Sequence, residues 1–209
     1  MKTKIFKILV FALVFWAIGS CQKDDEGNQN SSCEALLPAE TTTGANTFGA
    51  CINGRLLIPR DGTGTTMGDD YGAVLSGGYP NSLDYFELEI TDYKSEKKGN
   101  LLLHMHAVNL NGLGIYNINQ SNGMSNVDGL NHTYLHCMVF DDKTNSYQYY
   151  RSYENSGTLK ITRYDFTNRI VSGNFSCKLK NSANPNDEIE IKQARFDIKW
   201  DTLLNKPFP

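Results

Sequence analysis

Apolar and polar residues alternate along most of the chain after Phe48. In the segment 85–91 the alternating positions separate into two sets: Phe86, Leu88 and Ile90 against Glu87, Glu89 and Thr91. Because successive side chains of a β-strand point to opposite faces, this pattern predicts a strand with one buried face and one solvated face.

Further short runs of this kind continue to the C-terminus, separated by segments rich in turn-forming residues. They cover residues 48–59, 101–108, 112–119, 132–140, 146–153, 157–166, 169–179 and 189–200. In the first run Asn53 and Gly54 predict a two-residue type I′ turn, since both residue types accept positive φ angles. In the last run the apolar residues change from odd to even positions, which predicts a bulge near Lys192 and Gln193.

The number and length of these runs indicate the fold class. No stretch has sustained helical periodicity, and no internal repeat is present. About ten short strands within residues 47–209 predict one all-β domain, either a single antiparallel β-sandwich or a calycin-like up-and-down barrel.

The first 20 residues have the three-part order of a signal peptide: three lysines, an apolar stretch from Ile8 to Ile18, then Gly19 and Ser20. The apolar stretch is shorter than the roughly 18 residues that a membrane-spanning helix needs. Residues 18–21 resemble the lipobox of bacterial lipoproteins, in which the cysteine carries the lipid and becomes the new N-terminus. We therefore expect lipidation of Cys21; the alternative is a plain signal peptide with a chance cysteine.

The segment after Cys21 predicts where the protein is displayed. It consists of Gln22, Lys23, Asp24, Asp25 and Glu26. These residues resemble the acidic export tag of Bacteroidetes lipoproteins, which implies exposure on the outer face of the outer membrane; the alternative is a solvated spacer. Residues 21–46 are polar and poor in aromatic side chains, which predicts a lipidated tether.

The charge of the chain argues against a nucleic-acid partner. The formal net charge is −3, and loss of three lysines with the signal peptide would make it about −6. Nucleic-acid binding depends on lysine and arginine side chains that neutralise phosphates. We expect the membrane, through the lipid on Cys21, and a protein or glycan ligand as partners instead.

Four cysteines follow Cys21. An exported protein meets oxidising conditions, so disulfides are expected. Proximity in the sequence favours pairing of Cys33 with Cys51 and of Cys137 with Cys177. The alternative is that these cysteines are buried as thiols in the core.

Three segments resemble a known family: TGANTFGACINGR (43–55), SGTLKITRYDFTNRIVSGNFS (156–176) and ARFDIKW (194–200). They are similar to an uncharacterised family of small Bacteroidetes lipoproteins with TGxNTFGCxVNG-like, SGTFSF-like and GRFDIKY-like motifs. The resemblance implies a β-rich lipoprotein domain with no assigned activity. In the family pattern a cysteine follows TFG directly, whereas here Ala50 intervenes, which weakens the pairing of Cys33 with Cys51. Cys177 stands where the family has an aromatic residue, which implies a core position.

All four histidines fall in two predicted strands, as His104, His106, His132 and His136. Each pair shares a strand face opposite the apolar set, because its members are two or four residues apart. If the two strands are neighbours, four imidazoles gather on one surface, where they could bind zinc, copper or nickel. The alternative is a set of solvated histidines on a polar face.

A tyrosine-rich stripe offers another candidate surface, with Tyr147, Tyr149, Tyr150 and Tyr153 around Arg151. Tyrosine rings can stack on sugars, which suits a glycan binder at the cell surface. The alternative is that tyrosine is simply a favoured residue of β-sheets.

Motifs for catalysis do not occur in the sequence. It contains no G-x-S-x-G elbow, no H-E-x-x-H pair, no EF-hand loop and no P-loop, and it leaves the identity of any cofactor unknown. The sequence therefore predicts a non-enzymatic surface or outer-membrane lipoprotein that acts by binding or as an envelope component. The alternatives are a transition-metal protein that uses the histidines and a surface glycan binder.

Overall fold

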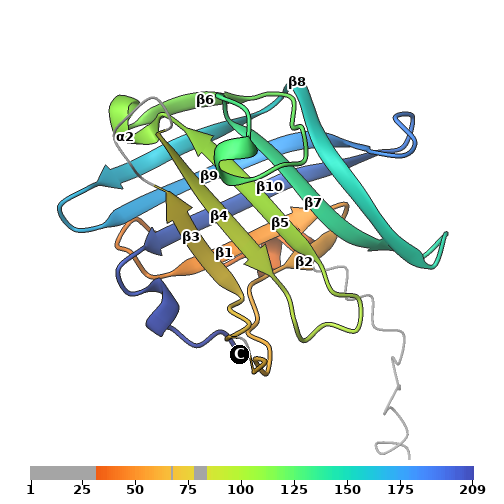
Figure 1. Cartoon of the computed structure of the whole chain (residues 1–209), viewed down its shortest axis with the longest axis horizontal. Helices are drawn as coiled ribbons and strands as arrows, with labels where there is room; N and C mark the ends of the chain where they lie inside the picture. Colours follow the sequence, from red (N-terminus) through yellow and green to blue (C-terminus); the bar gives the residue numbers. More distant parts are fainter. Residues whose placement is uncertain (1–31, 67, 78–83) are drawn as a thin grey trace, which may run out of the picture. The chain divides into compact units, whose positions relative to one another are not determined.

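Antiparallel strands make up most of the chain, as a computed structural model shows for residues 32–66, 68–77 and 84–209 (Figure 1). The predicted signal peptide, the lipidation site Cys21 and the export tag 22–26 lie outside these described residues. The strands are β1 (Thr47–Ile52), β2 (Arg55–Leu57), β3 (Ala73–Gly77), β4 (Tyr85–Thr91), β5 (Asn100–His106), β6 (Gly114–Ile118), β7 (Tyr134–Asp141), β8 (Ser146–Asp165), β9 (Ile170–Asn181) and β10 (Glu188–Lys199). The short helices are η1 (Cys33–Leu36), α2 (Val108–Asn111), η2 (Asn126–Asp128) and η3 (Leu203–Asn205).

One ten-stranded sheet contains all the strands of the described residues, in the order β2-β1-β10-β9-β8-β7-β5-β4-β3, with β6 paired to the second half of β8. The sheet curls into a half-barrel, so that β3, β4, β5 and β7 lie in front of β1, β10, β9 and β8 in Figure 1. The predicted all-β class with about ten strands is confirmed.

A hydrophobic core fills the inside of this curl. Phe86 of β4 reaches across it to Trp200, just after β10, with ring centroids 5.4 Å apart, and to Tyr164 of β8 at 6.1 Å. Leu88, Leu103, Leu135 and Ile198 are fully buried on the same inner face. The alternating apolar positions of strands that are distant in the sequence therefore meet in one core.

Two local predictions about the backbone are confirmed. Asn53 and Gly54 have φ angles of 49° and 81° and join β1 to β2, with Ile52 paired to Arg55, as a type I′ hairpin requires. The pairing of β10 with β9 shifts between Ile191 and Ala194, which is the predicted bulge. The bulge allows both apolar halves of β10 to face the core.

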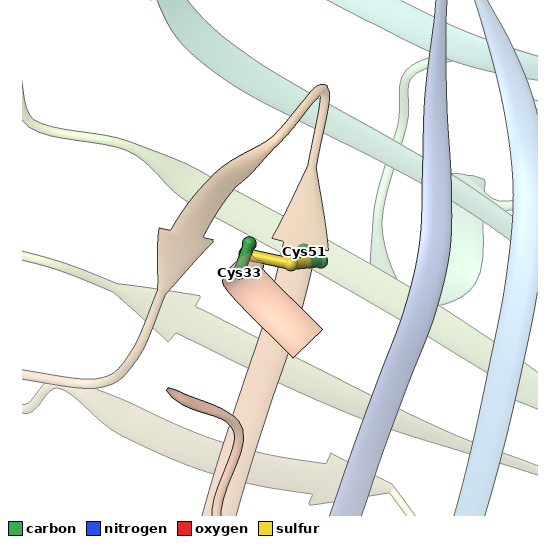
Figure 2. The surroundings of a disulfide bond; sticks show 2 residues. All are labelled: Cys33 and Cys51. Carbon is green, nitrogen blue, oxygen red and sulfur yellow. A yellow bond between two sulfur atoms is a disulfide. The ribbon is translucent and has the colours of Figure 1, made fainter. Parts of the chain in front are cut away.

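The β domain begins earlier than residue 47, because the compact unit spans Ser31–Pro209. Residues 32–46, which we assigned to the tether, pack against the sheet: Cys33 forms a disulfide with Cys51 (Figure 2), and Leu37 is buried. Since Cys51 lies on the outer face of β1, opposite the barrel core, the disulfide holds η1 against the outside of the sheet. Ala50 moves the cysteine one position later than in the family pattern, to the outer face of β1, and the disulfide forms there. The expectation that this change weakens the pairing of Cys33 with Cys51 is therefore wrong.

The second predicted disulfide, between Cys137 and Cys177, is wrong. Both residues are buried thiols on the inner side of β7 and β9, and β8 runs between these strands. Neighbouring strands are about 4.8 Å apart, so strands separated by a third are roughly 10 Å apart, beyond the Cα distance of about 4.4–6.8 Å that a disulfide needs. The alternative prediction, that these cysteines are buried as free thiols in the core, is confirmed for Cys137 and Cys177.

Candidate functional site

A cavity of about 460 Å³ opens at one end of the curled sheet. Three connections meet there: the β1–β2 hairpin, the β4–β5 turn at residues 92–99 and the β7–β8 turn at residues 142–145. Small-molecule sites in proteins typically measure roughly 300–1,000 Å³. The cavity is therefore large enough for a small ligand.

The inner wall of the cavity is mainly apolar. Leu57 of β2 and Ile189 of β10 are buried there, and Val139 of β7 is half-buried. Tyr150 of β8 adds a buried aromatic ring, whose hydroxyl donates a hydrogen bond to Asp187 at 2.7 Å. Burial and this carboxylate raise the pKa of Tyr150 to about 12, so the phenol is neutral at physiological pH. The wall can bind the apolar part of a ligand without placing a charge against it.

The rim of the cavity carries charged side chains from β2 and from the two turns. Arg55 and Lys97 both bind the Asp142 carboxylate, with Lys97 Nζ 2.5 Å from Oδ1, and Arg55 also donates to the Phe140 carbonyl at 2.9 Å. We call these three charged residues the rim bridge. Since β2 and the two turns are joined by no other ion pair among the described residues, the rim bridge is the charged link across the mouth.

A second ion pair, more buried than the rim bridge, also lines the cavity. Arg60 Nε donates to Asp92 Oδ1 at 2.7 Å, and the backbone N–H groups of Lys94 and Ser95 donate to the same oxygen. Burial alone would raise the pKa of Asp92, but these donors together hold it below its ordinary value. Asp92 is thus a fixed anion that organises the β4–β5 turn.

The four histidines lie near the outer face of β5 and β7, away from the cavity. His104 is only 2% exposed; its Nδ1 lies 2.8 Å from Glu87 Oε1, and its ring stacks on Tyr134 with centroids 4.4 Å apart. Glu87 is fully buried and also accepts a hydrogen bond from the Asn126 N–H at 2.7 Å. The segment 119–133 covers this part of the sheet, so the predicted solvated face is wrong here, although Glu89 on the same face of β4 is exposed.

The predicted four-histidine metal site does not form among the described residues, in which no three histidine, cysteine or acidic side chains converge as metal ligands. The ring nitrogens have other partners: His132 Nε2 lies 2.8 Å from the Gln120 carbonyl, and His136 Nδ1 lies 3.1 Å from Ser121 Oγ. Burial, followed by the nearby Arg151 charge, lowers the pKa of His136, and burial with two neighbouring histidines lowers that of His106. Burial thus disfavours the charged form of His106 and His136, and the printed partners of the His132 and His136 rings are protein oxygens rather than other histidines.

The tyrosine stripe is divided between the two faces of β8. Tyr147, Tyr149 and Tyr153 lie on the outer face, whereas Tyr150 points inward and lines the cavity. Tyr149 is 60% exposed, while Tyr153 is partly occupied by a hydrogen bond to Glu188 and by Lys180, 4.5 Å above its ring. The prediction of one four-tyrosine surface is therefore wrong, because alternation along a strand turns Tyr150 to the core.

The cavity and its rim bridge were not predicted from the sequence. Lys97 and Asp142 stand in turns with ordinary turn composition, and Arg55 follows a hairpin, so none of them is distinctive alone. The only signal was the concentration of charge in both turns. Their approach depends on the curl of the whole sheet.

Comparisons of the chain with protein-family models, curated proteins and solved structures find no match. The resemblance to small Bacteroidetes lipoproteins therefore stays a prediction. Among the described residues, none of the helices has the length and hydropathy required to cross a membrane.

Proposed function

We propose that this protein is a lipid-anchored outer-membrane protein, exposed at the cell surface, whose β domain binds a small ligand in the cavity without chemical conversion. The observation that carries the proposal is the cavity of about 460 Å³ with an apolar wall and a charged rim. Such a combination suits a ligand with one apolar and one polar part. Burial of the apolar part contributes about 0.8 kcal/mol per methylene group.

The regular structure of the cavity wall also supports a binding role. The wall residues belong to strands β1, β2, β7, β8 and β10 of one sheet, and the disulfide fastens β1 from outside. A preformed site loses little conformational entropy when it binds, which favours affinity.

Equilibrium dialysis with radiolabelled decanol tests the binding function. The measurement uses the full-length protein after processing by the cell. The decanol taken up by matched lipid samples without the protein is subtracted from the decanol taken up with it. Val139→Trp places a large side chain in the cavity and should reduce decanol binding at least tenfold. Tyr149→Trp, on the exposed outer face of the neighbouring strand, should leave binding unchanged. Absence of decanol binding to the wild type, or equal binding to Val139→Trp, would contradict the proposal.

The proposed location rests on Cys21 and residues 22–26. Cys21→Ala should abolish labelling by a fatty-acid analogue and release the protein from the membrane fraction. Alanines at Lys23–Glu26 should keep the lipid and remove the access of added protease on intact cells. Unchanged protease access would contradict the export tag alone, whereas an unlabelled wild type would contradict the anchor.

A second candidate function is glycan binding on the outer face of β8. It is favoured by the exposure of Tyr149 beside Tyr147, whose ring packs edge-on against Phe140 at 5.3 Å. Aromatic rings exposed in this way can stack on sugar rings. A glycan array should then show a signal that Tyr149→Ala removes and Val139→Trp preserves.

A further inference from the structure

We propose that the ligand of the cavity carries a carboxylate head, which binds Arg55 and Lys97 in the place that the Asp142 carboxylate now takes. This inference rests on the proposed binding function. It identifies the ligand class as a single-chain amphipathic acid, with its apolar chain along the inner wall and its head at the rim.

The arrangement of the rim bridge supports this assignment. Two cations from separate elements, Arg55 on β2 and Lys97 in the β4–β5 turn, converge on one carboxylate from the β7–β8 turn. Arginine and lysine are the usual partners of a carboxylate in proteins. Asp142 thus marks a position where two cations already bind a carboxylate group.

The rim bridge is exposed enough to exchange its anion. All three side chains are about half-exposed. Ion pairs of this kind contribute little to stability because water screens them. A ligand carboxylate can replace Asp142 at small cost, since the same two cations remain paired.

The charge of the whole rim favours an anion over a cation. The cavity is lined by five cationic side chains against three carboxylates: Arg55, Arg60, Lys97, Lys98 and Lys143 against Asp92, Asp141 and Asp142. The chain as a whole has a formal net charge of −3, so this positive excess is local. A rim of this sign attracts anionic ligands and repels cationic ones.

The distance between rim and wall fits a molecule with a charged head directly beside an apolar chain. Arg55 and Leu57 are two residues apart on β2, so they share a strand face roughly 7 Å apart. Leu57 is buried in the wall, whereas Arg55 is exposed at the mouth. A carboxylate at Arg55 therefore places the first methylene groups of its chain near Leu57.

The test compares decanoate with decanol, which share a chain and differ in the head, by equilibrium dialysis of the processed full-length protein at pH 7.5. Asp142→Asn removes the internal competitor and should tighten decanoate binding about fivefold relative to decanol binding. Arg55→Gln should weaken decanoate binding about tenfold relative to decanol binding, the size of one hydrogen bond to a charged group. Arg151→Gln, which makes the same change on the outer face of β8, should alter neither.

The possible results separate the inference from the proposed function. If neither compound binds the wild type, the binding function itself fails. If both bind, but Asp142→Asn and Arg55→Gln leave the ratio of their affinities unchanged, the carboxylate assignment is overturned. A parallel loss of both ligands in Arg55→Gln, with no effect of Asp142→Asn, also overturns it, because Arg55 would then act on the shape of the cavity.

Discussion

The Asp197 carboxylate of β10 lies 2.8 Å from the backbone nitrogen of Gly44, which stands 153 positions earlier in the chain. The same carboxylate accepts hydrogen bonds from the N–H groups of Thr43 and Ala45 and from the Ser172 hydroxyl of β9. Gly44 has a φ of +78°, so the backbone can curl around the two oxygens. Asp197 thereby joins the three segments 43–55, 156–176 and 194–200, which lie on neighbouring strands.

Replacement of Asp197 by Asn should destabilise the domain by about 2–4 kcal/mol. Asn carries no charge, and only one of its two terminal atoms can accept, so several of the partly buried N–H and O–H donors around Asp197 lose their partner. Urea unfolding followed by tryptophan fluorescence measures the change. The matched control, Asp201→Asn, alters an exposed carboxylate after β10 and should shift the free energy of unfolding by less than about 0.5 kcal/mol.

The stability should also depend on Asp197 through pH. Burial alone would raise its pKa, but the hydrogen bonds from Ser172, Ala45, Thr41 and Gly44 together hold it below the ordinary value of 3.8. A lowered pKa in the folded state stabilises the protein fully above the unfolded pKa and loses this effect as pH falls through the folded pKa. Between pH 5 and pH 2, the stability of the wild type should therefore fall more steeply than that of Asp197→Asn. Parallel slopes would show that Asp197 is not the titrating group.

Reduction of the bond between Cys33 and Cys51 should lower stability by about 3 kcal/mol. The two residues are 18 positions apart, and closing a loop of this size removes conformational entropy from the unfolded chain. Thermal unfolding of the oxidised protein and of the Cys33→Ser, Cys51→Ser double variant measures this effect. A reducing agent should lower the Tm of the wild type and leave that of the double variant unchanged.

The thiols of Cys137 and Cys177 should resist alkylation in the folded protein. Burial raises the pKa of Cys137 to about 12 and also raises that of Cys177, so neither forms a reactive thiolate at neutral pH. Mass spectrometry after iodoacetamide treatment at pH 8 should find both unlabelled in the native protein and labelled in guanidinium. Rapid native labelling, or a peptide in which they are cross-linked, would contradict this arrangement.

Glu87→Ala should cost about 2–4 kcal/mol of unfolding free energy. The substitution leaves the His104 ring nitrogen and the Asn126 N–H without their buried acceptor. Glu89→Ala provides the control, because Glu89 is on the same strand and face but exposed. Equal effects of the two variants would show that the cover formed by residues 119–133 does not exclude water.

Several features of the fold could be predicted because they depend on neighbouring residues. Alternation with a period of two identified β4, and the same pattern identified β9. Asn53 and Gly54 determined the hairpin through their own φ preferences, and the phase change before Ala194 located the bulge. These signals are local, since backbone sterics and strand geometry act over a few residues.

The sequence by itself thus determined the strands, the hairpin, the bulge and the candidates for export and lipidation. Only the tertiary structure decided that Glu87 and His104 are buried and that β8 separates Cys137 from Cys177. It also decided that the backbone at Gly44 binds the Asp197 carboxylate. It also brought Arg55, Lys97 and Asp142 to one rim. The physical reason is that burial and charge pairing depend on which distant segments the curled sheet brings together. Alternation along a strand distinguishes its two faces, but it does not specify which segments cover them.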